Sequence, residues 1–347
     1  MPLLNFGVMP AGASGGNELQ AVTRRAVMPA VVVQIGKATV TLSSLLSAAE
    51  PVSGGVSPVT VPVQGTRMVS GAWADYSGSF AAPQVLPGLQ NAEYNLKAFV
   101  VGIPYYLFEG LIQQDADIVP IIWARMNDAG NYTSDQLATA IWTALSANTG
   151  LMPFSLNDII ATTDPTQGAV GNIPRATNTW WQANVKTIAS INSASSAWSR
   201  TNAMAGVISA QKAAGGEPPS CGICSPGAWM AIAADFSGSE RFNVNPEGTY
   251  GDSEEGATTY FPAINVAGIP VYADLYYPDD TTMVLPNFNY LQFKIHQDAA
   301  FAVAGPESLL PQFQLGYVMA LFVLLETVCS KPVAQTKLTG FTGAFSV

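Results

Sequence analysis

The sequence predicts an α+β fold, in which helices are inserted among antiparallel strands. Residues 117–147 carry the longest helical pattern of the chain. After residue 220 the chain changes to short apolar runs separated by turns, and residues 315–329 form a final apolar, strand-like block. Helices inserted among antiparallel strands, without a regular βα repeat, indicate an α+β domain. No internal repeat of fixed period is present.

The first hundred residues are expected to be extended. Residues 1–58 are rich in Gly, Ala, Pro and Ser and carry two short apolar stretches, Ala30–Ile35 and Val40–Leu46, which suggests an extended arm with one strand or short helix. Residues 59–64 alternate Val with Thr, Pro and Gln, a strand pattern whose proline makes it an edge strand or a loosely paired one. A second extended segment, residues 94–105, follows, so we interpret 59–103 as a long two-stranded excursion. Such a hairpin is marginal by itself and needs another surface to lie on.

Two helices are predicted in the middle of the chain. Asp117 is a suitable N-cap for the first, and Pro120 falls in its first turn, where the missing N–H costs little. Apolar residues recur at helical spacing toward residue 147, although Gly130 weakens the middle and permits a bend or break. The second helix is expected over 194–214, because two glycines and then two prolines follow it closely and prevent its continuation.

Beyond residue 220 the pattern favours strands. Apolar runs at residues 264–274, 282–285 and 290–296 are separated by turns, and the last run alternates apolar and polar residues as a half-buried strand does. Ala228–Ala234 suggests one or two further helical turns.

The composition points to a chain that associates with others. The chain has 347 residues and a mass of 36.4 kDa, which corresponds to about two domains. Hydrophobic residues make up 48%, but only 11% are charged, against roughly 25% in a typical soluble domain. A compact globule of this mass exposes roughly 13,500 Å², so 14 basic and 24 acidic residues leave much surface uncharged. Such surface usually marks an interaction site, and we expect an obligate oligomer.

The same numbers argue against several classes of protein. A net charge of −10 without a cluster of Lys and Arg disfavours sequence-specific nucleic-acid binding. The apolar runs 98–108 and 315–325 fall short of the roughly 20 residues that span a bilayer, and the N-terminus lacks the pattern of a secretory signal. Three cysteines make a disulfide framework implausible and suit a reducing compartment.

The candidate ligand residues for a metal are few. Cys221-x-x-Cys224, Cys329 and the single histidine, His296, could in principle form a zinc site. Only one knuckle is present, so a redox-active pair and simple buried thiols stay open as alternatives, and we favour buried thiols. The acidic residues between 247 and 255 lack the spacing of a calcium loop, which favours a solvated loop over loose divalent binding. We expect no catalytic, cofactor or metal site.

The tryptophans also have two interpretations. Trp180-Trp181, or Trp123 with Trp142, could form a platform for a sugar or a base. With so few cationic residues nearby, packing in the core and at subunit interfaces explains them better.

Residues 166–182 read TQGAVGNIPRATNTWWQ and resemble a segment common in the major capsid proteins of tailed bacteriophages with the HK97 fold. Other stretches resemble this family in the same order: Ile103–Tyr106 before the long helix, Gly268–Asp274, and Leu285–Leu291. Together the resemblance covers about residues 59–340. Asn172 and Pro174 depart from the family pattern, so the loop at 171–175 is expected to differ in shape.

The resemblance implies the organisation of an HK97-like capsid subunit. Its parts are an N-terminal arm, an extended E-loop hairpin that lies across a neighbouring subunit, a peripheral (P) domain with a long spine helix at about 117–147, an axial (A) domain, and a return to the P domain. In this order the parts occupy residues 1–58, 59–103, 104–214, 215–310 and 311–347.

The resemblance further implies a structural protein that is not an enzyme. It would self-assemble as hexamers and pentamers into an icosahedral shell around double-stranded DNA, which it would not bind sequence-specifically. Its implied partners are other copies of the chain, a separate scaffolding protein, a portal and decoration proteins, with no membrane. The implied location is the virion capsid, assembled in the host cytoplasm. An encapsulin-like nanocompartment shell that holds an enzyme cargo is the alternative on the same fold. An unrelated soluble enzyme is a third, which a chain with one histidine disfavours.

Within the implied E-loop we expect Arg67, Trp73 and Tyr76 to contact a neighbouring subunit, because of their position and side-chain type. Deletion of residues 66–92 should leave a folded monomer that cannot form shells. Some relatives crosslink their subunits through a Lys and an Asn. Lys97 is the only lysine of the E-loop segment and lies near its base, so no crosslink is expected.

Overall fold

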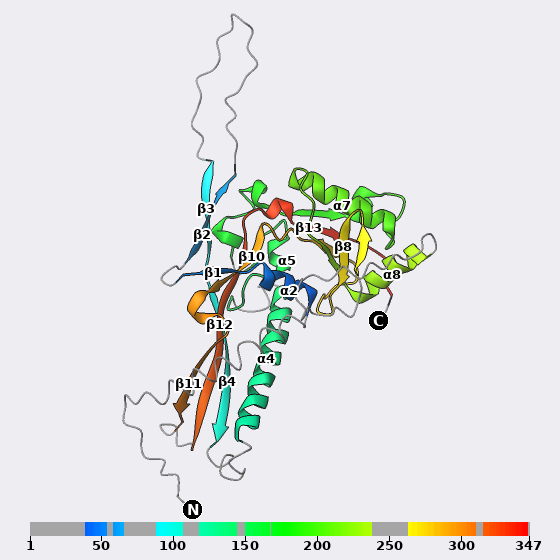
Figure 1. The fold of residues 1–347 in the computed structure, drawn as a ribbon. Coiled ribbons are helices and arrows are strands. Elements are labelled where there is room, and N and C mark those ends of the chain that lie inside the picture. Colours follow the sequence, from blue (N-terminus) through cyan, green and yellow to red (C-terminus); the bar gives the residue numbers. More distant parts are fainter. Residues whose placement is uncertain are drawn as a thin grey trace, which may run out of the picture.

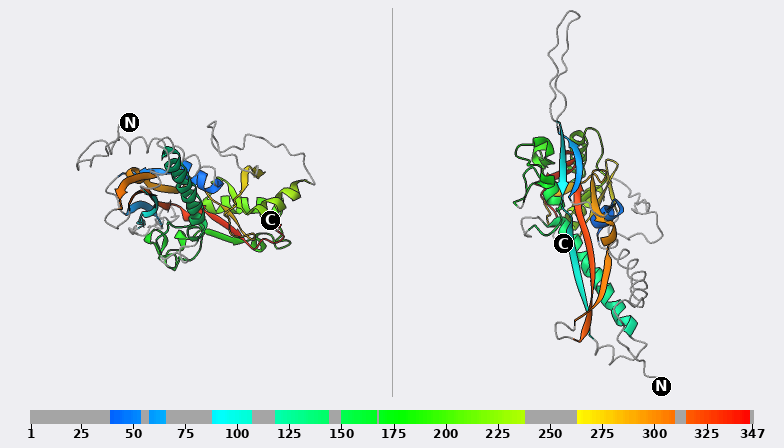
Figure 2. Two further views of the ribbon diagram at one scale, coloured as in Figure 1. Left: turned by 90° about the horizontal axis from the view of Figure 1, so that it is seen from below. Right: turned by 90° about the vertical axis from the view of Figure 1, so that its left-hand side faces the viewer.

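A computed structural model describes residues 39–53, 58–65, 88–106, 118–143, 150–166, 168–237, 263–309 and 315–345. These residues form a body of sheet and helices, from which an elongated limb of strands and one long helix extends (Figure 1). A short hairpin lies at the opposite end of the molecule from the tip of the limb (Figure 2). The element order confirms the predicted α+β class.

The limb is built on a five-stranded sheet. Its strands are β1 (Glu50–Val52), β4 (Lys97–Tyr106), β10 (Leu291–His296), β11 (Ala302–Ser308) and β12 (Gly316–Cys329). β12 pairs antiparallel with β4, β10 and β11, and β4 and β11 flank the same stretch of it. β1 joins the sheet parallel to β10. The predicted final strand and the predicted alternation in 290–296 are therefore confirmed.

The long helix α4 (Ile118–Trp142) runs along this sheet in both views (Figures 1 and 2). It continues through Gly130 without a break, because apolar side chains on both sides of the glycine are buried in one core: Met126, Ala129, Leu137 and Ile141. The helix ends at Trp142, five residues earlier than predicted, and the expected cap Asp117 lies outside the described residues.

The body contains a six-stranded mixed sheet. In spatial order its strands are β5 (Asn184–Thr187), β13 (Thr336–Thr339), β9 (Met283–Leu285), β6 (Gly222–Cys224), β8 (Ile269–Ala273) and β7 (Ile264–Val266). Helices α7 (Arg200–Ala214) and α8 (Pro226–Ser237) pack in one hydrophobic cluster with Cys224, and the neighbouring Ile223 belongs to the larger core shared with the limb. Both faces of this sheet are thus covered.

The start of α7 corrects a prediction. The helix begins at Arg200 rather than residue 194, because the Asn202 side chain donates to the carbonyls of Ser195 and Ala197 and holds them in a loop. Ser199 caps the helix by accepting from the Asn202 N–H. The predicted end is confirmed, since Gly215 adopts a left-handed conformation with φ of 84°.

The hairpin also corrects a prediction. β2 (Val59–Gln64) pairs only with β3 (Leu89–Tyr94), as expected for an edge strand with a proline. The returning chain does not stay in the hairpin, because residues 97–106 form β4 and pair with β12 in the limb sheet. Residues 59–103 are therefore not one two-stranded excursion.

Short elements complete the fold. Of the strand and short helix that the sequence left open, residues 40–46 form the helix, within α2 (Val40–Ser47), and the Thr39 hydroxyl caps it by accepting from the Leu42 N–H. The others are α5 (Leu156–Ile159), α6 (Ile188–Ile191), η2 (Val170–Asn172), η3 (Thr179–Trp181), η4 (Gln297–Ala299) and η6 (Pro332–Ala334). Within the ranges given above, no helix has the length and apolar character needed to cross a membrane.

Candidate functional site

Three strands of the limb, β11, β12 and β4, form a ribbon with two different faces. On its inner face Ile103, Met319 and Leu321 are buried in the core that includes α4. Phe99 lies on the same face, and its ring packs against Tyr132 of α4 with 6.3 Å between centroids. The inner face is therefore covered by α4 and the core of the same subunit.

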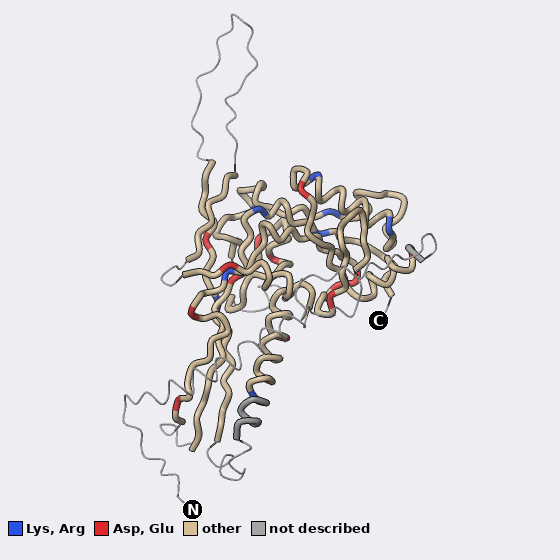
Figure 3. The backbone as a smooth tube through the Cα atoms, viewed as in Figure 1, with Lys and Arg blue, Asp and Glu red and all other residues tan. Residues whose placement is uncertain are grey.

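The outer face of the ribbon is apolar as well, but the chain leaves it half-buried or exposed. Val100 is 60% exposed and lies in register opposite Phe322. Strand register places the following residues on this outer face: Ala98, Val100, Gly102, Pro104, Ala302, Ala304, Val318, Ala320, Phe322 and Leu324. None of these ten carries a charge, although exposed Glu307 of β11, in register with Val318, adds one carboxylate to the same face. Figure 3 shows the limb almost free of Lys, Arg, Asp and Glu. A contiguous apolar face of this kind marks a surface for another molecule.

The two edge strands of the ribbon, β11 and β4, differ in how well they are protected from pairing with a further strand. β11 carries a register irregularity between Ala304 and Glu307, and it holds a proline and an acidic residue. These are features that protect an edge strand from pairing. β4 has one proline, Pro104, in ten residues, and no second strand pairs with it in the described part of the chain. The edge formed by β4 is therefore the less protected one.

Glu326 marks the end of the exposed outer face. Its side chain is fully buried, and its Oε1 accepts hydrogen bonds from the N–H groups of Phe154, at 2.7 Å, and Thr327, at 3.0 Å. Its Oε2 has no hydrogen-bond partner among the described residues. Burial raises the pKa of this carboxyl to about 8, against a smaller opposing effect of these N–H groups and of Lys97. The carboxyl is thus largely protonated at neutral pH.

The segment that resembles the capsid family, residues 168–182 as described, folds around buried Arg175. The Arg175 guanidinium donates to the backbone carbonyls of Asp158, Ile159 and Thr163 at 2.7 to 3.0 Å. Burial lowers the pKa of Arg175, opposed by the negative charge of Asp164. Because these acceptors are backbone groups of the same subunit, Arg175 fixes the loop around α5.

The three cysteines are free and buried, so of the alternatives considered, buried thiols fit best. Burial raises the pKa of Cys221 and Cys224, and raises that of Cys329 to about 12, which disfavours thiolate chemistry. The Nδ1 of His296 accepts from the Asp298 N–H at 3.2 Å. Among the described residues, no three His, Cys, Asp or Glu side chains are grouped as metal ligands.

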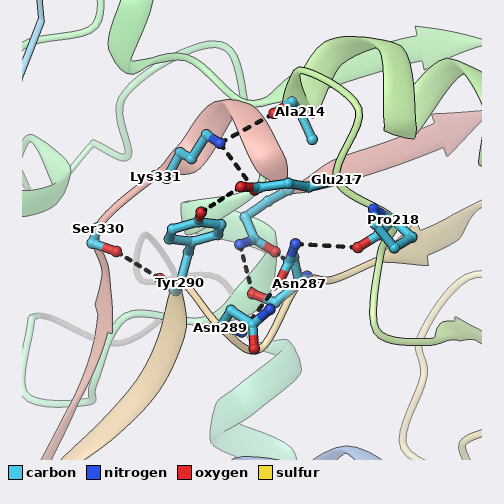
Figure 4. Close-up of polar contacts among 9 residues, drawn as sticks. Ala214, Glu217, Pro218, Asn287, Asn289, Tyr290, Ser330 and Lys331 are labelled. Atoms are coloured by element: carbon cyan, nitrogen blue, oxygen red, sulfur yellow. Dashed lines mark hydrogen bonds and ion pairs between the residues drawn. The ribbon is translucent and has the colours of Figure 1, made fainter.

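A polar network connects the end of α7 to the start of β10 and the end of β12 (Figure 4). Lys331 Nζ donates to the Ala214 carbonyl at 3.1 Å and to Glu217 Oε2 at 3.0 Å. The Tyr290 hydroxyl donates to Glu217 Oε1 at 2.9 Å, and the Lys331 ammonium lies 4.7 Å from the centre of the Tyr290 ring. All of these residues belong to the same chain, so the network connects α7, β10 and β12 within one subunit.

The predicted contact residues Arg67, Trp73 and Tyr76 lie outside the described residues, and their role stays a prediction. Sequence reasoning missed the outer face of the ribbon. The available signal was the stretch from Ala98 to Tyr106, which is apolar at nearly every position rather than at alternate ones. That pattern indicates a strand with two apolar faces.

Comparison with known proteins identifies the fold. The sequence alone matches no family model and no curated protein. Solved structures do match over most of the chain. The cyanophage A-1(L) capsid subunit has 15% identity and a TM-score of 0.58, with 86% of this chain and 93% of that one covered. The capsid of an empty GTA particle has 16% identity and a TM-score of 0.54, with coverage of 88% and 96%.

A third match is the SrpI encapsulin of Synechococcus elongatus PCC 7942, with 10% identity, a TM-score of 0.50, and coverage of 86% and 87%. The three proteins are shell-forming subunits by their descriptions. The chain has the fold of capsid subunits, and within that class it has the α+β HK97-like fold that residues 166–182 suggested.

Proposed function

We propose that this chain is the major capsid protein of a tailed bacteriophage. It self-assembles as hexamers and pentamers into an icosahedral shell that encloses double-stranded DNA, and it has no enzymatic activity. In this mechanism one surface of each copy binds a different surface of the next, and such heterologous contacts close into rings. The proposed location is the virion capsid, after assembly in the host cytoplasm.

The outer face of the ribbon is the observation that carries this proposal. Ten uncharged positions on three strands would leave a large apolar surface in water if the chain were a monomer. Burial of apolar surface contributes roughly 25 cal/mol per Å², and a shell repeats that gain in every subunit. We propose that a neighbouring copy covers this face, with Arg67, Trp73 and Tyr76 as candidate contacts from its E-loop.

The proposed domain boundaries need two adjustments: β4 moves out of the 59–103 segment, and β10 and β11, within the 215–310 segment, belong to the limb sheet. The hairpin of the E-loop has its paired base at Val59–Gln64 and Leu89–Tyr94. The P domain would take the limb and α4, and the A domain would take most of the six-stranded sheet. β4 then belongs with the P domain, since it pairs with β12 along ten residues.

The proposed partners are other copies of the chain, a scaffolding protein, a portal and decoration proteins. The net charge of −10 predicts weak binding to DNA. Affinity for duplex DNA at physiological salt should be low, and tight binding with a steep salt dependence would contradict a shell that only encloses its genome.

Electron microscopy of the chain expressed alone, beside size-exclusion chromatography, tests the proposal. Closed shells or capsomer rings are expected, either directly or after coexpression with the product of a neighbouring gene tested as a scaffolding protein. The matched variant replaces residues 66–87 by a two-residue turn between Gly65 and Gly88, whose backbone groups are already hydrogen-bonded at 2.9 Å. It should stay folded and form no shells. A chain that stays monomeric under all these conditions would refute the proposal.

The structure alters the deletion first suggested by the sequence. Removal of residues 66–92 would take away Ala92, which is fully buried and lies opposite Val61. That variant would damage the subunit core and confuse misfolding with failed assembly.

The encapsulin-like shell is a second candidate, favoured by the match to the SrpI encapsulin. The contents of particles purified from the natural source distinguish the two. Nuclease-protected DNA supports the phage capsid, and a protein cargo without DNA supports the nanocompartment.

A further inference from the structure

The base of the β2–β3 hairpin is seated on the segment 168–182, which we name the bracket. Val59 and Val63 of β2, with Ala92 and Tyr94 of β3, are buried on the face that joins the main core. β3 lies against η2, which belongs to the bracket. The hairpin base is therefore a packed part of the subunit.

Two glycines allow this close seating. A Cβ atom at Gly65 would lie 2.2 Å from Cε2 of Trp180, so the indole occupies the space where a side chain would project. Gly171 has φ of 65°, and a Cβ there would lie 3.0 Å from the Ala92 Cβ and 3.1 Å from the Tyr94 hydroxyl. Gly65, which faces Trp180, directly follows the end of β2. Gly171 faces Ala92 and Tyr94 of β3.

Buried hydrogen bonds and ring contacts within the subunit hold the bracket in place. Trp181 is 1% exposed, its Nε1–H donates to the Val170 carbonyl at 2.9 Å, and its ring meets Trp180 edge-on with 5.5 Å between centroids. Arg175 anchors the same segment to three backbone carbonyls around α5. Tyr94 donates its hydroxyl to the Cys329 carbonyl at 2.8 Å, which connects the hairpin to the end of β12.

We propose that the bracket sets the direction in which the hairpin leaves the subunit, with Trp180 against Gly65 as its outer contact. Trp180 and Gly65 are then positioning residues, which act through the hairpin rather than by touching a neighbouring copy. This inference rests on the proposed function for its consequence in assembly, since the hairpin carries the contacts proposed for the next subunit. The orientation itself can be measured on the unassembled chain.

The test uses spin labels on cysteines introduced at Leu89, which is 75% exposed, and at exposed Lys212 on α7. The three native cysteines are buried and should not label. Gly65→Ala forces the indole or the strand to move by about 1 Å before ordinary contact is restored. The mean distance between the two spin labels should therefore shift. Trp180→Ala should keep the mean but broaden the distribution. The double variant should restore the mean and stay broad.

Thr60→Ala is the control, because Thr60 is an exposed residue of the same strand, adjacent to the buried face. It should change neither the mean nor the width. A role in stability alone would lower the unfolding midpoint of the Gly65 and Trp180 variants without moving the distance. A wild-type distribution in both single variants would overturn the proposal.

Assembly is the second readout. Gly65→Ala should give fewer closed particles or particles of altered curvature under conditions in which the wild type closes. If the wild type never assembles, the proposed function fails, while the distance measurement still decides on the bracket. If shells of wild-type shape form despite a shifted hairpin, the bracket does not control assembly geometry and the inference is overturned.

Discussion

The body and the limb use similar strands in different ways. In the body, β6 and β9 are buried at every position, because α7 and α8 cover one face of the sheet and the main core covers the other. In the limb, β4 is as apolar as these strands, yet it has a helix on one face and open surface on the other. The difference shows that an apolar strand face predicts that something will pack against it. The pattern does not tell whether that partner is part of the same chain or of another.

This contrast makes separate predictions for stability and assembly. Substitutions in the body should act on the free energy of unfolding of one subunit. Substitutions on the outer face of the ribbon should leave that quantity nearly unchanged and act on association.

Trp198→Ala should have the largest effect. The indole stacks on Phe341 with 3.9 Å between centroids and 6° between planes, and both rings are buried. Removal of a buried aromatic side chain typically costs about 3–5 kcal/mol, to which the lost hydrogen bond from Nε1–H to the Asp280 carbonyl adds. Urea unfolding of the unassembled subunit measures the loss. A change below about 1 kcal/mol would mean that this part of the body does not depend on the stack.

Arg175→Met should destabilise the subunit by about 1–3 kcal/mol, because buried backbone carbonyls would lose their donors. Arg175→Lys should not restore the loss, since a single ammonium cannot reproduce the planar fork of the guanidinium. Full recovery with lysine would show that only the positive charge at this position matters.

Glu326→Gln should change how stability depends on pH. The carboxyl has a pKa of about 8 in the folded chain against 4.5 as its ordinary value, so the folded state retains a proton that the unfolded state releases. Wild-type stability should therefore fall by up to about 1.4 kcal/mol per pH unit as pH rises from about 5 to about 8, and level off above that.

The glutamine variant keeps an oxygen that can accept from Phe154 and Thr327 and carries no titrating proton. The difference between wild type and variant, measured by urea unfolding at a series of pH values, isolates this carboxyl. A difference that is constant from pH 5 to pH 8 would contradict the raised pKa.

Val100→Asp should have the smallest effect on the subunit and the clearest effect on the shell. The side chain is 60% exposed, so the unfolding free energy should change by less than about 0.5 kcal/mol. Assembly should be lost, because a neighbour would have to bury an unpaired carboxylate. Thr201→Asp, at an exposed position of α7, is the matched control and should assemble normally. Normal shells from Val100→Asp would show that this face is not an interface.

Much of the architecture was predictable because local pattern and final burial agree. The alternation in 290–296 became β10, the apolar block 315–329 became β12, and the glycines after residue 214 ended α7. One error arose where side-chain contacts decide between two local conformations. Residues 194–199 carry three serines, which suit caps and loops as well as a helix, and the Asn202 side chain holds this segment as a loop.

The candidate site was less predictable than the fold. Trp180 and Gly65 are 115 positions apart in the sequence, and neither residue type by itself indicates a contact with the other. Cys221 and Cys224 have metal-like spacing, and only the structure shows that no further His, Cys, Asp or Glu of the described residues is grouped with them as a metal ligand.

The sequence by itself determined that this chain is α+β, poor in charge and suited to association, because composition and periodicity are properties of the chain before it folds. The tertiary structure decided which apolar faces meet inside the subunit and which remain for a partner. That choice depends on pairings such as β4 with β12, between residues more than 200 positions apart. Local pattern cannot encode such a pairing, since an apolar strand such as β4 could pair equally well with other apolar strands of the chain.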